Sequence, residues 1–127
     1  MTATTTDGPL ELTPAAYQIL LALAPEERHG YAILQEVREQ TDGRMRLGPA
    51  TLYRTLKRML EQGLIGECEE RPDPAMDDER RRYYRLTRQG VRAAEQESRR
   101  LESLVALARS RRLLRPDDGG QLVEEGL

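Results

Sequence analysis

A group of hydrogen-bonding and cationic side chains gathers on one short helix that the sequence predicts. The stretch LGPATLYRTLKRMLEQGLI (residues 47–65) opens with Gly-Pro, and polar residues occupy its first turns. The Thr51 hydroxyl can donate to a phosphate or touch a thymine methyl group, and Arg54 can pair with a guanine or a phosphate through two hydrogen bonds. We therefore interpret this helix front as a nucleic-acid-binding surface. Its candidate contact residues are Gly48, Pro49, Thr51, Tyr53, Arg54, Lys57 and Arg58.

The same residues also allow a plainer interpretation. In it, Tyr53 packs half-buried against the first predicted helix, while Arg54 and Lys57 are only solvated. Two features favour binding instead. The small residues at the helix start let the backbone approach a ligand closely, and a helix N-terminus attracts phosphate.

Residues suited to catalysis are few. The chain holds one histidine, His29, and one cysteine, Cys68, with no glycine-rich phosphate loop and no metal-ligand spacing. His29 stands before Gly30 at a helix start, where a structural role is expected. Cys68 stands among acidic residues, which disfavour its thiolate and hence a role in sensing oxidants. The sequence therefore predicts no enzyme, no cofactor and no metal.

Composition limits the fold and the location. With 127 residues, 33% of them charged and 4% aromatic, the chain is sized for one domain with a modest core, so an oligomer is plausible. No apolar run is long enough to span a membrane, no export signal is visible, and a single cysteine suits a reducing compartment. We expect a cytoplasmic protein.

The net charge of −2 hides a strong pattern. Basic residues outnumber acidic ones by seven to four in residues 28–66 and by eleven to three in residues 80–112, whereas the segments around these blocks are acidic. Such basic blocks fit DNA binding, and they also fit solvated helix faces.

Three helices, a hairpin and a long fourth helix are expected, in that order. Thr13 and Thr87 stand where helix caps belong, and Leu52, Leu56, Met59 and Leu60 form the apolar stripe that turns the third helix toward a core. The expected helices cover Pro14–Leu23, Tyr31–Gln40, the segment from Gly48-Pro49 to Gly63, and Arg88–Leu113. The expected strands cover Leu64–Glu70 and Arg81–Leu86, with a proline-rich loop over Arg71–Arg80.

This order is that of a winged helix-turn-helix domain with an added C-terminal helix, in a mainly α fold with a small β-hairpin. We assign residues 1–11 to a disordered arm, 12–86 to the DNA-binding domain, 87–113 to a dimerisation helix and 114–127 to an acidic tail. The wing tip is acidic and should be repelled by DNA, so wing contacts are expected near its base. The further candidate DNA contacts are Tyr31, Arg81, Arg82 and Tyr84.

The last helix carries an apolar stripe that a monomer would expose, which soluble monomers avoid. Pairing with a second copy removes this exposure, and it sets two reading helices near ~34 Å apart, the spacing of successive major grooves. Packing of the helix on its own domain is the alternative. The predicted dimer-interface residues are Tyr17, Leu21, Val91, Ala94, Leu101, Leu104, Val105 and Ala108.

Four separated motifs resemble the PadR family of bacterial transcriptional regulators: LTPAAYQILLAL, RHGYAILQEV, LGPATLYRTLKRMLEQGLI and RRYYRLTRQG, across roughly residues 12–110. The resemblance implies a homodimer that reads a palindromic operator and represses a neighbouring operon until a small-molecule or stress signal relieves it. The chain has no tryptophan, so the tryptophan pair that stacks planar drugs in some relatives cannot form here. The alternative function is a winged-helix module that binds protein instead of DNA.

Overall fold

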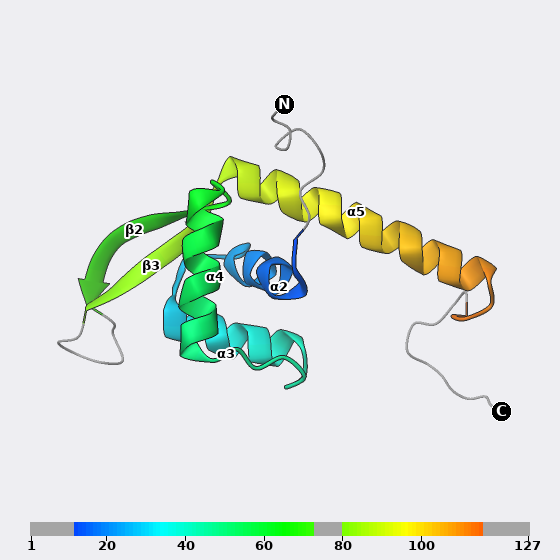
Figure 1. The fold of residues 1–127 in the computed structure, drawn as a ribbon, viewed down its shortest axis with the longest axis horizontal. Helices are drawn as coiled ribbons and strands as arrows, with labels where there is room; N and C mark the ends of the chain where they lie inside the picture. The colour runs from blue at the N-terminus through cyan, green and yellow to red at the C-terminus, as the bar shows by residue number, and fades with distance from the viewer. Residues whose placement is uncertain (1–11, 73–79, 116–127) are drawn as a thin grey trace. The chain divides into compact units, whose positions relative to one another are not determined.

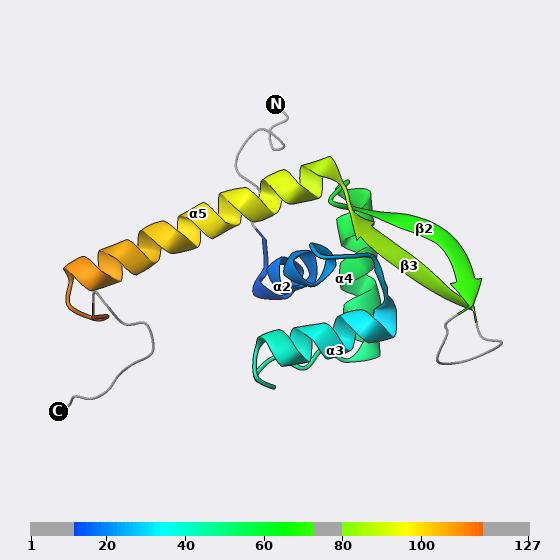
Figure 2. The ribbon, with the colours of Figure 1, turned by 180° about the vertical axis from the view of Figure 1, so that it is seen from behind.

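The computed structural model describes residues 12–72 and 80–115, and the side chains of 12–68 and 82–115 (Figures 1 and 2). The helices are α2 (Pro14–Leu23), α3 (Gly30–Gln40), α4 (Pro49–Glu61) and α5 (Arg88–Ser110), and the strands are β1 (Arg28–His29), β2 (Ile65–Pro72) and β3 (Arg80–Leu86). The mainly α fold with a small antiparallel sheet is confirmed. The predicted N-terminal arm, the acidic wing tip and most of the tail lie outside the described residues.

The chain divides into two compact units, Met1–Gln96 and Glu97–Leu127. The division falls inside α5, because Ala93 in its second turn belongs to the core of the first unit. The assignment of residues 12–86 to a DNA-binding domain and of 87–113 to a dimerisation helix stays a prediction. Within the described residues of the second unit, Arg100 donates to both carboxylate oxygens of Glu97, at 2.9 and 2.6 Å. These hydrogen bonds hold the pKa of the Glu97 carboxyl below its ordinary value.

Threonine hydroxyls begin two of the helices, as predicted. The Thr13 hydroxyl accepts from the Ala16 N–H at 3.1 Å, and Pro14 takes the first helical position, where no N–H is needed. The Thr87 hydroxyl accepts from the Gly90 N–H at 3.0 Å and donates to the Gly63 carbonyl at 2.6 Å. Thr87 therefore starts α5 and ties it to the end of α4.

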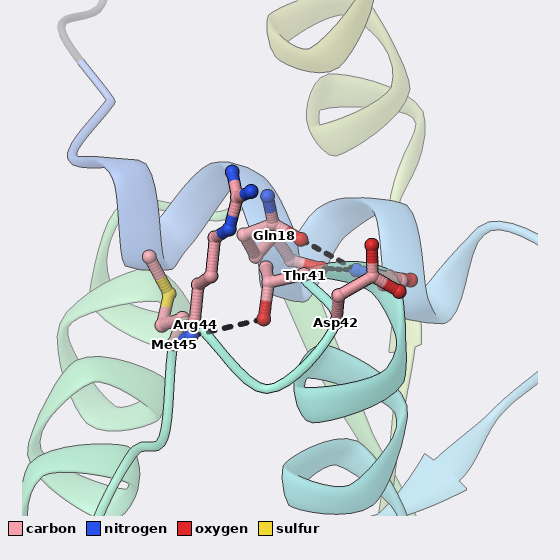
Figure 3. A pocket seen from close by; sticks show the side chains of 6 residues that line it. Gln18, Thr41, Asp42, Arg44 and Met45 are labelled. Atoms are coloured by element: carbon pink, nitrogen blue, oxygen red, sulfur yellow. Dashed lines mark hydrogen bonds between the residues drawn. The ribbon is translucent and has the colours of Figure 1, made fainter.

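The turn between α3 and α4 is held by side chains from three segments (Figure 3). The Gln40 amide donates to the backbone carbonyl of Gln18 at 3.1 Å and to its side-chain oxygen at 2.8 Å, which joins α3 to α2. The Thr41 hydroxyl donates to the Val37 carbonyl at 2.9 Å and accepts from the Met45 N–H at 3.0 Å. These bonds fix the path along which the chain enters α4.

One core fills the space between α2, α3, α4 and the sheet. Figure 1 shows α4 crossing beside α2 and α3, with the hairpin on its other side. The stripe predicted for α4 faces this core: Leu52, Leu56 and Met59 are buried, and Leu60 packs partly buried against them. The largest fully buried side chains are Ile19, Leu20, Ile33, Leu52, Leu56, Met59, Leu64 and Val37.

The sheet differs from the prediction in two ways. It has a third strand, β1, which is only two residues long and pairs with β3, so the strand order is β1-β3-β2. The hairpin is also longer than expected, because the pairing resumes after an irregularity between Cys68 and Arg71 and continues to Pro72 opposite Arg80. A proline fits there because β2 is an edge strand, where an N–H is dispensable. The prediction of a loop over the whole of Arg71–Arg80 is therefore wrong at both ends.

The ends of α4 and α5 share one backbone geometry, in which a residue with positive φ reverses the chain, but the residue is a glycine in one case and an arginine in the other. Gly63 ends α4 at φ +78°, with its N–H donating to Leu60 and the next N–H donating to Met59. Arg112 does the same after α5 at φ 65°, a conformation that costs an arginine more than a glycine. The final helix was expected to reach Leu113, but this reversal ends it at Ser110.

Gly90 permits the close approach of α5 to the end of α4. A Cβ atom there would collide with the backbone carbonyl of Leu64 and press on the Leu86 side chain. Because a backbone atom cannot swing aside, we predict that Gly90→Ala lowers the free energy of unfolding by about 1–3 kcal/mol. Denaturant unfolding measures it. Glu95→Ala, at an exposed position on the same helix, should change stability by less than about 0.5 kcal/mol. Equal stabilities for the two variants would contradict this account of Gly90.

Candidate nucleic-acid interface

The predicted contact residues of α4 lie on its exposed side. Thr51 is half-buried at the helix edge, and the other predicted residues of the segment are exposed. We call this surface the α4 front; it consists of Gly48, Pro49, Thr51, Tyr53, Arg54, Lys57 and Arg58. Its exposure follows from the stripe on the opposite side, since Leu52, Leu56 and Met59 are almost wholly buried. The front is cationic, because the only acid on α4 is Glu61, at its far end.

The start of α4 is open to an anion. Gly48 is the N-cap residue and makes no side-chain capping bond, Pro49 follows, and the first turn holds no acidic residue. The first N–H groups of the helix and its dipole are therefore not neutralised by a side chain of the cap. A Cβ atom on Gly48 would meet nothing within 4 Å, and its φ of −77° suits any residue. Nothing in the fold requires a glycine here, so the missing side chain suits close approach of another molecule.

Thr51 holds Arg54 near the start of the helix. The Arg54 guanidinium donates to the Thr51 hydroxyl at 3.4 Å, one turn back along α4. The Thr51 carbonyl accepts from the Thr55 hydroxyl at 2.8 Å. The long bond to Thr51 orients the exposed Arg54 side chain toward the helix N-terminus without engaging all of its donors.

Tyr53 contacts the start of α3. Its hydroxyl and ring lie directly over Gly30, where a Cβ atom would collide with them, and the side chain is 49% exposed. The plainer interpretation of Tyr53 foresaw half-burial against the first helix; the contact is instead with the first residue of the second. Tyr31 beside it is 53% exposed, and its hydroxyl accepts from the Gln35 amide at 3.2 Å. Two tyrosines therefore stand at the junction of α3 and α4, each with exposed ring surface.

The wing residues separate into an exposed and a buried group. Arg82 is exposed, and its guanidinium lies 3.0 Å from the Glu67 carboxylate on the neighbouring strand. Arg81 lies in β3 opposite Arg71, and its side chain is outside the described ones. Tyr84 is only 4% exposed, so its prediction as a surface contact to DNA is wrong. The alternation of strand residues explains this error, because Tyr84 shares the inner face of the sheet with the core residues Ile65 and Leu86.

The environment of Tyr84 favours the neutral form of its hydroxyl. Burial and then the negative charge of Glu67 raise the pKa of Tyr84 above its ordinary value, with a smaller contribution from Tyr53 and an opposing one from Arg82. Side chains of β2, β3 and α4 thus act together on the pKa of Tyr84.

His29 and Arg28, in the basic block of residues 28–66, make contacts that stabilise the fold. The His29 ring nitrogen Nδ1 accepts from the Ala32 N–H at 3.2 Å and so caps α3, and its ring meets Tyr83 edge to face at 5.4 Å. The expectation of a structural role for His29 is confirmed. Arg28 donates to the Ala22 carbonyl at 2.6 Å and lies 3.8 Å from Glu36, with its side chain only 17% exposed. Its charge is therefore not presented at the surface.

Two exposed cations that were not among the predicted contact residues precede the α4 front in the sequence. Arg44 and Arg46 lie in the segment that leads into α4, and both are exposed. Arg46 stands two residues before Gly48, and this proximity to a helix N-terminus is a signal that the sequence contains.

The predicted dimer-interface residues lie partly or largely at the surface. On the first unit, Leu21 and Val91 are exposed, while Tyr17 and Ala94 are half-buried. On the second unit, Leu104 and Val105 are exposed at 48% and 39%, while Leu101 and Ala108 are half-buried. Large apolar side chains thus remain accessible to solvent on α5.

The contact between Gly30 and Tyr53 gives a stability test of the α3–α4 junction. We predict that Gly30→Ala displaces the Tyr53 ring and lowers the free energy of unfolding by about 0.5–1.5 kcal/mol. In a Tyr53→Ala background the same change should cost nothing, or should stabilise slightly because alanine favours a helix more than glycine. Denaturant unfolding of the four proteins measures the coupling. The same cost in both backgrounds would show that Tyr53 does not pack on Gly30.

Within the described part of the chain, no helix has the length and apolar character needed to cross a bilayer. The same residues contain no cluster of three or more histidine, cysteine, aspartate or glutamate side chains arranged to hold a metal ion.

Solved structures similar to this chain include bacterial transcriptional regulators. A PadR family transcription regulator from Clostridium difficile R20291 is 27% identical, with 74% of this chain and 95% of that chain covered and a TM-score of 0.61. A transcriptional regulator from Clostridium thermocellum is 26% identical, with 74% and 88% covered and a TM-score of 0.61. The fold also matches a PadR-like transcriptional regulator from Bacillus cereus at 19% identity, with 74% and 86% covered and a TM-score of 0.62. No curated protein matches this chain.

The family itself is shown by the sequence match. Residues 19–96, more than half of the chain, match the transcriptional regulator PadR-like family. The match runs from the second half of α2 through α3, α4 and the wing to the first turns of α5, and so includes the whole α4 front. It confirms the prediction of a regulator instead of an enzyme, since members of this family are transcriptional regulators. With its winged fold and its cationic α4 front, the chain belongs to the PadR-like family of transcriptional regulators.

Proposed function

We propose that this protein is a homodimeric repressor that reads a palindromic operator with α4 and controls a neighbouring operon. The observation that carries the proposal is the α4 front, in which cationic and hydroxyl side chains surround a helix start whose N-cap residue, Gly48, makes no side-chain capping bond. A reading helix places its N-terminal residues nearest the base edges. Gly48 then serves close backbone approach, which explains a glycine that the fold does not require.

The contacts differ along the helix. Arg54 reaches a guanine or a phosphate near the helix start, where Thr51 already orients it. Lys57 and Arg58 lie one turn further on and contact phosphates, which fix the register without reading sequence. Tyr31 and Tyr53 offer exposed ring faces and hydroxyls at the α3–α4 junction. Arg82 contacts a phosphate from the base of the wing.

The second part of the proposal concerns α5. Its outer part exposes Leu104, Val105 and Leu107, each between 39% and 48%, on one helix. A contiguous set of large apolar side chains on a soluble protein marks an interface. A second copy of the chain covers them by pairing α5 with its twin, and two-fold symmetry gives a palindromic operator. The residues assigned to this interface are Tyr17, Leu21, Val91, Ala94, Leu101, Leu104, Val105 and Ala108.

Repression follows from occupancy of the operator, and a small-molecule or stress signal relieves it. The chain offers no tryptophan to stack a planar drug, so the effector is not assigned to that chemistry. A regulator of this kind works in the cytoplasm, where its DNA lies. Protection of the upstream region of its own gene by the purified protein locates the operator.

The DNA-binding part of this proposal is tested with variants of the α4 front. We predict that Arg54→Ala weakens operator binding by about 1–3 kcal/mol, because a bidentate contact is lost. Gly48→Asp should weaken binding more strongly, because it places a carboxylate against phosphate. Yet it should preserve or slightly raise thermal stability, since aspartate is a favourable N-cap residue and suits the helix dipole. Fluorescence anisotropy with labelled operator and thermal unfolding measure the two effects.

Normal operator affinity in both variants would remove α4 as the reading helix. A wild-type protein that retards no duplex at any salt concentration would favour the alternative function, a module that binds protein. True DNA binding should instead weaken steeply as salt rises, because phosphate contacts release counterions.

The dimer is tested at Leu101. We predict that Leu101→Asp yields monomers, because it puts a charge inside the apolar α5 interface. Leu113→Asp is the matched control, since Leu113 lies beyond the end of α5 and is 79% exposed; it should leave the dimer intact. Light scattering after size-exclusion chromatography gives the mass, and circular dichroism checks that α5 remains helical. A dimer that survives Leu101→Asp would count against this interface.

A further inference from the structure

An ion pair crosses the wing at its base. The Arg82 Nη1 atom of β3 donates to the Glu67 Oε2 atom of β2 at 3.0 Å. The two side chains are partly solvated, at 53% and 39% exposure. In the strand register Glu67 pairs with Tyr84, and Arg82 precedes Tyr84 by two residues. Glu67 and Arg82 are therefore diagonal neighbours on one face of the hairpin.

That face is the one turned toward the helices. It carries Tyr84, which is almost fully buried, and continues into Ile65 and Leu86 at the core. On the same face, Glu67 lies opposite Tyr84 and Arg82 lies two residues before it, and both of these charged side chains are partly exposed. Arg82 is exposed on this face, and the proposed function assigns it a phosphate contact from the base of the wing. The pair thus belongs to the surface that the proposed function assigns to DNA.

The pair has little value for the fold. Ion pairs between partly exposed side chains contribute little to stability, and salt screens them further. The β2–β3 pairing and the buried Tyr84 hold the hairpin without it. A carboxylate on a surface that receives DNA also repels phosphate, which is a cost for binding. Glu67 therefore has a chemical effect at this place that stability does not explain.

We propose that Glu67 competes with a DNA phosphate for Arg82 and so limits the sequence-independent part of the affinity for duplex DNA. The inference rests on the proposed function. In the free protein the Arg82 guanidinium donates to Glu67; on binding it redirects donors to a phosphate, and the Glu67 carboxylate is left beside the backbone of the duplex. Glu67 is a positioning residue in this scheme, since it acts on DNA through Arg82 and through its own charge.

The test compares wild type with Glu67→Gln on a mixed-sequence duplex of about 30 base pairs, long enough for two half-sites one turn apart. Glutamine keeps the size of the side chain and removes its charge. We expect Glu67→Gln to bind about three- to tenfold more tightly near 50 mM salt, with the gain shrinking toward roughly 200 mM. The slope of log affinity against log salt should steepen by up to about one unit, as for one added phosphate contact.

Two further variants separate the role of Arg82 from a general change of charge. Glu61→Gln removes the same charge at the far end of α4 and should change affinity by less than about twofold, since screened charges distant from the contact act weakly. Arg82→Gln should weaken binding. In the Arg82→Gln background, Glu67→Gln should raise the logarithm of the affinity by less than half as much as it does in wild type. Thermal unfolding confirms that each variant is folded.

Unchanged or weaker binding by folded Glu67→Gln overturns the inference. So does an equal gain with and without Arg82, because Glu67 would then act by bulk repulsion alone. These results leave the proposed function in place, since wild type still binds the duplex. A wild-type protein that binds no duplex even at the lowest salt overturns the proposed function itself, and the inference with it.

Discussion

Burial of one stripe of α4 determines how this molecule can present a helix to DNA. Leu52, Leu56 and Met59 are almost wholly inaccessible, so α4 cannot rotate about its axis without exposing apolar surface. Each such side chain contributes about 1.5–3 kcal/mol when it is buried, so even a small rotation is opposed. With the stripe fixed, Arg54, Lys57 and Arg58 must lie on the outer side. The cationic front is thus a consequence of core packing.

The buried stripe fixes the rotation of α4 about its axis but not its position along that axis. Polar contacts at both ends of the helix fix this position. Thr41 and the two glutamine amides hold the entry to α4, while the positive φ of Gly63 and the hydroxyl of Thr87 hold its exit. Tyr53 adds a contact between the front and Gly30 at the start of α3. A side chain that helps to position the front is therefore also part of the front. Loss of the Tyr53 side chain would therefore affect both stability and binding. A side chain added at Gly48 would meet nothing within the fold, so a substitution there separates the two effects more cleanly.

Much of the fold could be predicted from the sequence, because its signals are local. The caps at Thr13 and Thr87, the stop at Gly63 and the stripe of α4 depend on residues within a few positions of one another, and the structure places them as expected. What could not be predicted depends on contacts distant in sequence. The strand β1 is two residues long and exists only because β3 pairs with it. The burial of Tyr84 depends on which face of β3 turns inward, and a run of basic and aromatic residues carries no clear alternation. The reversal at Arg112 uses a residue that gives no stop signal.

Charge follows the same distinction between local and distant contacts. The sequence gives the number of basic residues, but their exposure and their partners depend on the fold. Arg28 belongs to the first basic block, yet its side chain is mostly buried among the Ala22 carbonyl and the acids Glu26 and Glu36. Arg82 belongs to the second block and already faces Glu67. By contrast, Arg54 meets only the neutral hydroxyl of Thr51 among the contacts of its described surroundings, so its full charge remains available to an anion. Among the described side chains, the charge of Arg54 is therefore more available to an anion than that of Arg28 or Arg82. In the proposed function this matters because contacts of α4 with base edges read sequence, whereas phosphate contacts only fix the register.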